Sequence, residues 1–97
     1  MQLARTAQVQ RFVAANIRRL RARQDITQEE LAEKASLGAV HVRSIERGVE
    51  NVTLATLVAI ADALGVAPGL LLRRATLPPL RPGRPRTRLA TRLGLKR

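Results

Sequence analysis

Apolar residues recur at helical spacing from the start of the chain. Val9, Val13 and Ile17 lie four positions apart, and Leu20 continues the stripe three positions later. Apolar residues three or four positions apart form one face of an α-helix. We therefore expect a long amphipathic helix there, with arginines on its other face and its end near Asp25.

Three further helix starts share one pattern, in which a capping residue lies between two apolar residues. Thr27 is a good N-cap, and Glu30 three positions later completes a capping box. Ile26 before the cap and Leu31 after the first turn form a hydrophobic staple. The pattern recurs around Gly38, a weaker cap between Leu37 and Val42, and around Thr53, between Val52 and Leu57.

The helix ends are marked by glycine and proline. Gly48 and Gly65 follow the third and fourth predicted helices, at the position where a helix commonly ends on a left-handed residue. Pro68 opens a short fifth helix at the first position, where proline is tolerated. Four prolines within residues 78–85 forbid a continuing helix. The expected fold is therefore all-α, a compact five-helix domain over residues 8–73, followed by a flexible basic tail over residues 75–97.

Composition narrows the possible chemistry. The chain has no cysteine and one histidine, which argues against disulfides, a thiolate metal site or a histidine metal cluster. Its carboxylates are scattered along helices, without a partner base or nucleophile, so we expect no enzyme activity, no metal and no cofactor. No apolar run approaches the roughly 18 residues of a membrane span, and no secretory signal is evident. We expect a cytoplasmic protein without a membrane partner.

Charge is distributed unevenly along the chain. The net charge is +11, and it resides in the two ends, since residues 27–74 carry five basic and six acidic side chains. Residues 75–97 carry seven basic side chains and no acid. A near-neutral centre with cationic ends suggests a folded module that binds a polyanion, most commonly nucleic acid.

The second and third predicted helices, at about 28–35 and 39–47, are joined by the short turn "SLG". This arrangement is a helix-turn-helix, in which the second helix can enter the major groove of DNA. Val42 and Ile45 point toward the core in this register. The outer face of the candidate recognition helix then carries Ala39, Val40, Arg43, Ser44 and Arg47.

Three longer strings of sequence surround this pair. They are "IRRLRARQDITQEELAEKA", "IERG" and "TLATLVAIADALGVAPGLLL". Together, in this order and separation, they resemble the Xre/Cro family of phage-repressor-type helix-turn-helix domains. The resemblance covers roughly residues 17–72, more than half of the chain.

The resemblance implies roles for four residues. Gln28, at the start of the second helix, is similar to the family residue that clamps a DNA phosphate together with the helix N-terminus. Asn51 resembles a second backbone-phosphate contact in the loop after the recognition helix. Arg21 and Glu46 match an ion pair that ties the first helix to the recognition helix; the alternative for Glu46 is a solvated surface acid.

The tip of the recognition helix departs from the family pattern. Family members often carry polar side chains where this chain has Gly38, Ala39 and Val40. Ala39 and Val40 can still touch thymine methyl groups. We expect base reading to concentrate on Arg43 and Ser44, with DNA shape read elsewhere. His41 is expected to be a partly buried structural residue, with a phosphate contact as the alternative.

Two apolar or basic features lie outside this helix pair. The leucines at 70–72 cannot all face one core, so they either pack in part on the first helix or form a homodimer contact. "GRP" at 83–85 resembles the core of an AT-hook, while the simpler interpretation is a non-specific arm. The tail residues expected to meet phosphate are Arg81, Arg84, Arg86 and Arg88.

The sequence thus predicts a sequence-specific regulator of transcription that binds double-stranded DNA, most simply a repressor. An alternative is the DNA-binding antitoxin of a toxin–antitoxin pair, with the leucines or the tail holding the toxin. A third hypothesis is a helical interaction module that no longer reads DNA, which the apolar helix tip supports and the basic ends oppose.

Overall fold

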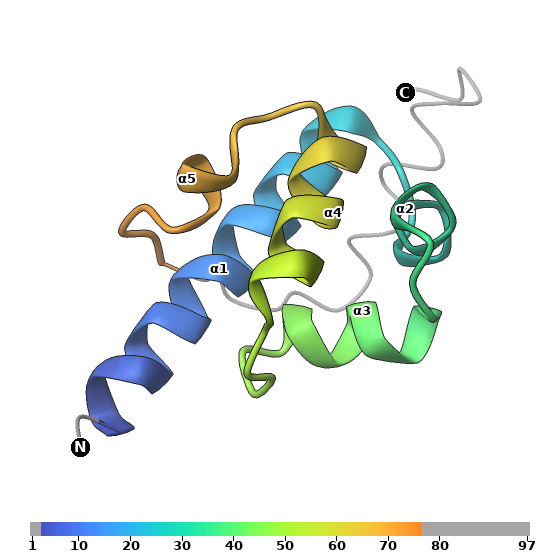
Figure 1. Ribbon diagram of the computed structural model, residues 1–97. Coiled ribbons are helices and arrows are strands. Elements are labelled where there is room, and N and C mark those ends of the chain that lie inside the picture. Colours follow the sequence, from blue (N-terminus) through green and yellow to red (C-terminus); the bar gives the residue numbers. More distant parts are fainter. Residues whose placement is uncertain (1–2, 77–97) are drawn as a thin grey trace, which may run out of the picture.

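Five α-helices run through residues 3–76, the part of the chain that the computed structural model describes (Figure 1). This part contains no strand, and the expected all-α architecture is confirmed. The helices are α1 (Leu3–Gln24), α2 (Gln28–Ala35), α3 (Ala39–Glu46), α4 (Leu54–Leu64) and α5 (Pro68–Leu71). The fold starts earlier than the expected residue 8, because α1 already begins at Leu3.

Helix α1 is the long amphipathic helix that the sequence predicts. Its first turns reach beyond the other helices, while its second half lies among them (Figure 1). It ends at Gln24, and the next residue, Asp25, has a left-handed φ of 58°, a conformation that aspartate tolerates better than most residues. No helix within residues 3–76 is long and apolar enough to cross a membrane.

The predicted caps are present. The Thr27 side chain accepts a bond from the Glu30 N–H, and the Glu30 carboxylate accepts one from the Thr27 N–H, at 3.0 and 2.7 Å. Thr53 caps α4 by accepting from the Thr56 N–H at 3.1 Å. Gly38 precedes α3 without any side-chain cap. The starts of α2 and α4 are therefore secured by side-chain caps, whereas the start of α3 has none.

Left-handed residues follow the helices at two glycines and, in addition to Asp25, at one serine. Gly48 and Gly65 have φ of 78° and 73°, as expected. The turn between α2 and α3 instead places Ser36 at φ 58°. A left-handed serine costs free energy, so this turn depends on the surrounding packing.

The core lies where α1, α2, α3 and α4 meet. It consists of aliphatic side chains, as the shortage of aromatic residues required. The fully buried large side chains include Ile17, Leu31, Val42, Ile45 and Ile60. In Figure 1, α4 is drawn in front of α1, α3 crosses below them and α2 lies on the opposite side from α5.

Helix α5 is docked by one leucine and one buried amide. Leu71 is fully buried, Leu70 is half-buried and Leu72 remains 45% exposed. The Asn16 amide, buried on α1, donates to the carbonyls of Leu71 and Arg73, each at 2.9 Å. Packing of α5 therefore uses only part of the leucine run, and Leu72 remains partly exposed.

Candidate nucleic-acid interface

Helix α3 divides into a buried and an exposed face, as its sequence pattern predicts. Val42, Ile45 and Glu46 are buried behind it. Val40 is 73% exposed and Arg43 48% exposed on the outer side. Ser44 is half-buried and Arg47, which caps the helix C-terminus, is exposed; α3 thus ends one residue before the predicted 47.

Ala39 lies differently from the expectation. It is half-buried and packs against the core beside Leu37. The reason is the turn, in which the Leu37 N–H bonds to the Ala32 carbonyl at 2.8 Å and brings the first residue of α3 back onto α2. Val40 is therefore the exposed apolar side chain in the first turn of α3.

Glu46 is held by two side chains from two other helices. Arg21 of α1 grips it with two bonds, Nε to Oε2 at 2.7 Å and Nη2 to Oε1 at 3.0 Å. The third guanidinium nitrogen of Arg21 donates to the Ile26 carbonyl at 3.0 Å. Glu46 is 3% and Arg21 17% exposed, so this bidentate pair is largely shielded from water. The predicted ion pair is present, and a solvated Glu46 is wrong.

Gln28 joins the same network. Its amide nitrogen donates to Glu46 Oε1 at 3.0 Å, which links the first turn of α2 to the last turn of α3. An amide nitrogen carries two N–H groups. Gln28 can hold Glu46 with one of them and present the other to a phosphate, so the contact with Glu46 fixes the side chain at the start of α2.

Arg43 faces an acid that the sequence reasoning overlooked. Its Nη2 lies 3.8 Å from Glu29 Oε2, with the two side chains 48% and 67% exposed. A surface pair at this distance is weak. The sequence did offer a signal for this pair, because Glu29 is an exposed acid in the first turn of α2. Arg43 can therefore exchange this carboxylate for a base edge or a phosphate at little cost.

His41 is partly buried, as expected. Its Nε2 lies 3.6 Å from Glu50 Oε2, and the two side chains are 37% and 35% exposed. Glu50 belongs to the loop between α3 and α4. His41 therefore contacts this loop from the first turn of the recognition helix.

The loop after α3 carries Asn51, which is exposed. Gly48 begins this loop against α1: a Cβ placed on it would lie 3.4 Å from Arg11 Cγ and 3.7 Å from the Ala14 Cβ. Arg11, itself exposed, thus lies beside the end of the recognition helix. Sequence spacing could not reveal this neighbour, because α1 and α3 meet only in the folded chain.

The candidate phosphate contacts of the tail lie outside the described residues. These are Arg81, Arg84, Arg86 and Arg88. The last described part of the chain contacts α1, where the Arg74 guanidinium lies 5.7 Å from the centre of the Phe12 ring. This cation–π distance is within the range of an attractive contact.

Sequence comparison relates this chain to known proteins. A helix-turn-helix family model matches residues 17–71. The control protein C.SmaI of Serratia marcescens is 38% identical over 69 residues, which cover 71% of this chain and 82% of that protein. The immunity repressor of Bacillus phage phi105 is 38% identical over 65 residues, covering 67% of this chain but only 45% of the repressor.

A solved structure agrees with these sequence matches. The restriction-modification controller protein C.AhdI from Aeromonas hydrophila superposes with a TM-score of 0.62 at 32% identity, covering 64% of this chain and 94% of that one. The matched residues 17–71 contain the whole α2–turn–α3 unit and its support from α1 and α4. This chain therefore belongs to the Xre-like helix-turn-helix family of DNA-binding transcriptional regulators.

Proposed function

We propose that this regulator is a repressor that places α3 in the major groove of a specific double-stranded DNA site. The exposed outer face of α3 carries the proposal. Val40 and Arg43 project from a helix whose opposite side is fixed by Val42, Ile45 and Glu46. A helix whose opposite face is packed against the core can enter a groove without rearranging the fold.

Within this proposal, bases are read by a short set of side chains. Arg43 is the long donor in the middle of the exposed face, suited to a guanine, and Ser44 follows it. Val40 would touch a thymine methyl group, with a smaller share for the half-buried Ala39. So few polar contacts leave part of the selectivity to the shape and deformability of the DNA.

Phosphate contacts would surround the reading helix. Gln28 at the start of α2, Arg47 at the end of α3 and Asn51 in the following loop supply them on the described part of the chain. These contacts fix the register on DNA and carry no sequence information. The tail arginines would add a salt-dependent attraction that does not depend on base sequence, as an arm or in an AT-hook-like manner.

The proposal also includes a second copy of the chain. Two large apolar side chains of α4 are exposed, Leu54 by 76% and Val58 by 39%. Exposed apolar groups of this size suit a contact between copies, and a two-fold dimer would match a palindromic site. The same groups could hold a toxin in the antitoxin alternative. Either assembly would act in the cytoplasm, without catalysis.

The central test separates reading from positioning. Arg43→Ala should weaken binding to the preferred site by about 1–3 kcal/mol while leaving random DNA almost unaffected, so that selectivity falls at one or two base positions. Gln28→Ala, the matched control, should weaken both DNAs similarly because phosphates are present in every sequence. Titrations of labelled duplexes at fixed salt would measure both. Equal losses for Arg43→Ala on both DNAs would show that Arg43 contacts only phosphate.

A further inference from the structure

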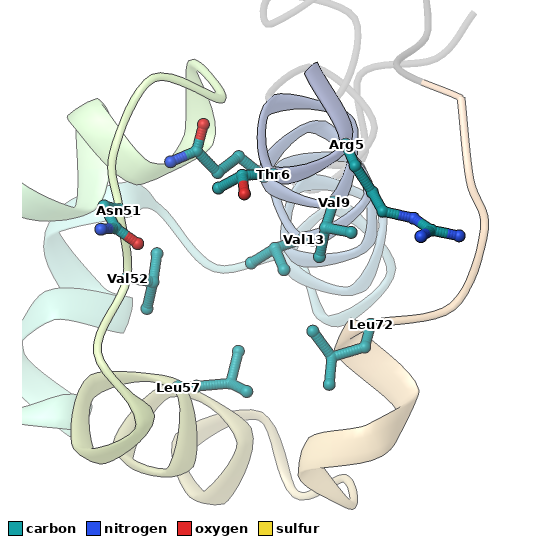
Figure 2. Close-up of a pocket in the computed structure, with 9 residues that line it drawn as sticks. Arg5, Thr6, Val9, Val13, Asn51, Val52, Leu57 and Leu72 are labelled. Atoms are coloured by element: carbon teal, nitrogen blue, oxygen red, sulfur yellow. The ribbon is translucent and has the colours of Figure 1, made fainter. Parts of the chain in front are cut away.

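A hollow of about 360 Å³ lies on the side of the molecule where α1 reaches beyond the other helices (Figure 2). Four parts of the chain that are distant in sequence surround it: the first half of α1, the loop after α3, α4 and the end of α5. Figure 2 shows the side chains of Val9, Val13, Val52, Leu57 and Leu72 directed toward the same space. The other residues that line it are Arg5, Thr6, Gln10 and Asn51.

The floor of this hollow is apolar. Val13 and Leu57 are buried there, at 4% and 5% exposure, and Val9 and Val52 are half-buried. Leu72 forms its lip and stays 45% exposed, although the neighbouring Leu71 is fully buried. Small-molecule sites are concave, mainly apolar and about 300–1,000 Å³ in volume, with a few polar groups that orient the ligand. The hollow meets each of these conditions at the small end of the range.

The charge at its rim restricts the kind of ligand. Arg5 is the single cation among the lining residues, and they include no acid. Arg5 lies at the edge of the hollow above Leu72 (Figure 2). The remaining polar side chains at the rim are a hydroxyl and two amides, which are neutral. The lining thus combines an apolar floor with one positive charge, the complement of a small molecule with an apolar body and one anionic group.

We propose that this hollow binds a small amphipathic carboxylate, with its apolar body on the valines and Leu57 and its carboxylate near Arg5. Such a ligand would contact α1 and the loop after α3 together, because Val52 and Asn51 line the same hollow. The regulatory consequence rests on the proposed function of Asn51 as a phosphate contact. A negative charge bound beside this loop repels the DNA backbone and neutralises Arg5, so the ligand lowers the affinity for DNA.

Sodium octanoate is a suitable probe, with 1-octanol as its uncharged analogue of equal chain length. Amide spectra of the full chain should show saturable shifts confined to residues that line the hollow. Octanoate should bind roughly three- to tenfold more tightly than octanol, the gain expected from one charge-assisted contact near the surface. Shifts that never saturate, or that spread over the whole surface, would overturn the proposal.

Two variants and one control locate the binding. Arg5→Gln should reduce octanoate affinity to the octanol level and leave octanol binding unchanged. Arg23→Gln removes an exposed arginine of the same helix that does not line the hollow, and it should change neither. Val9→Phe should fill the hollow and abolish binding of both probes, with thermal unfolding as the check on its fold. If Arg5→Gln and Arg23→Gln reduce octanoate binding equally, the proposed site is wrong.

The effect of the ligand on DNA binding is measured separately, by titrating the preferred DNA site with and without saturating octanoate. At an octanoate concentration that just saturates the natural chain, DNA binding should weaken about two- to fivefold in that chain and clearly less in Arg5→Gln, which binds octanoate more weakly. Octanoate binding without any effect on DNA affinity would overturn the regulatory role. Failure to bind DNA even without octanoate would instead reject the proposed function while the ligand site stands. If Val9→Phe changes the mass in sedimentation and octanoate does not bind, the hollow is a contact between copies and the proposal fails.

Discussion

Helices α2 and α3 have the same length, eight residues each, and yet their first turns are stabilised differently. Helix α2 has a capping box and two acids in its first turn, which interact favourably with the helix dipole. Helix α3 begins at an uncapped glycine and has no acid in its first turn. Both helices pack on the core, but α2 is also secured by its own caps, whereas α3 depends on tertiary contacts alone.

The difference follows from the surface that each helix presents. An acid in the first turn of α3 would place negative charge where the proposed DNA backbone lies. Helix α3 is instead stabilised by Val42 and Ile45 in the core and by Glu46, which is bound by Arg21 and Gln28. The lesson is that a helix can keep its outer face available for recognition when tertiary contacts replace local ones.

The largest expected effect comes from removing the hold on α3. Glu46→Ala leaves the guanidinium of Arg21 shielded from water without its carboxylate, and should lower the free energy of unfolding by about 3–5 kcal/mol, nearer the lower figure because Arg21 is 17% exposed. Chemical denaturation measures the loss. Glu33→Ala, an exposed acid of α2, is the control and should change stability by less than about 0.5 kcal/mol.

A double-mutant cycle identifies the partner. Arg21→Ala combined with Glu46→Ala should cost clearly less than the sum of the single changes, because the second removal no longer strands a charge. Additive losses would show that the two side chains do not stabilise each other.

The local hold on α2 should be weaker. Thr27→Ala removes the side chain that accepts from the Glu30 N–H, and should cost about 1 kcal/mol of folding free energy. DNA selectivity should be unchanged, since the outer face of α3 is untouched. A stability loss as large as that of Glu46→Ala would contradict the view that local capping counts for less than the buried network.

The contact between Glu29 of α2 and Arg43 of α3 can be tested through DNA binding. Glu29→Gln removes the carboxylate 3.8 Å from Arg43 and should raise affinity for the preferred DNA about two- to fivefold at low salt. Glu33→Gln makes the same change farther along α2 and serves as the control. Duplex titrations of both variants would decide, and an equal rise in both would mean that only the net charge matters.

The smallest effect should come from giving α3 the cap that it lacks. Gly38 has φ −73° and open space where a Cβ would lie, so Gly38→Ser is allowed and should stabilise the fold by about 0.5 kcal/mol. Gly65→Ser also has open space but sits at φ 73°, and should destabilise by about 1 kcal/mol. Thermal unfolding compares the two. A loss at Gly38 would show that its flexibility is needed.

The sequence determined the elements, because their signals are local. The caps Thr27 and Thr53 and the left-handed glycines at 48 and 65 each act within a few neighbouring residues, and all were found as predicted. The pair of Arg21 and Glu46 was also anticipated, although only through family resemblance. Spacing alone does not join two residues that lie 25 positions apart.

Tertiary structure decided which side chains become contact partners. Only the folded chain brings Glu29 to Arg43, turns Gln28 toward Glu46 and draws Ala39 back onto the core. The hollow beside Arg5 likewise exists because α1, a loop and two other helices converge there. Caps and apolar periodicity are governed by neighbours in sequence, whereas side-chain partners and cavities depend on how whole helices pack, and that packing is set by the sum of many distant contacts.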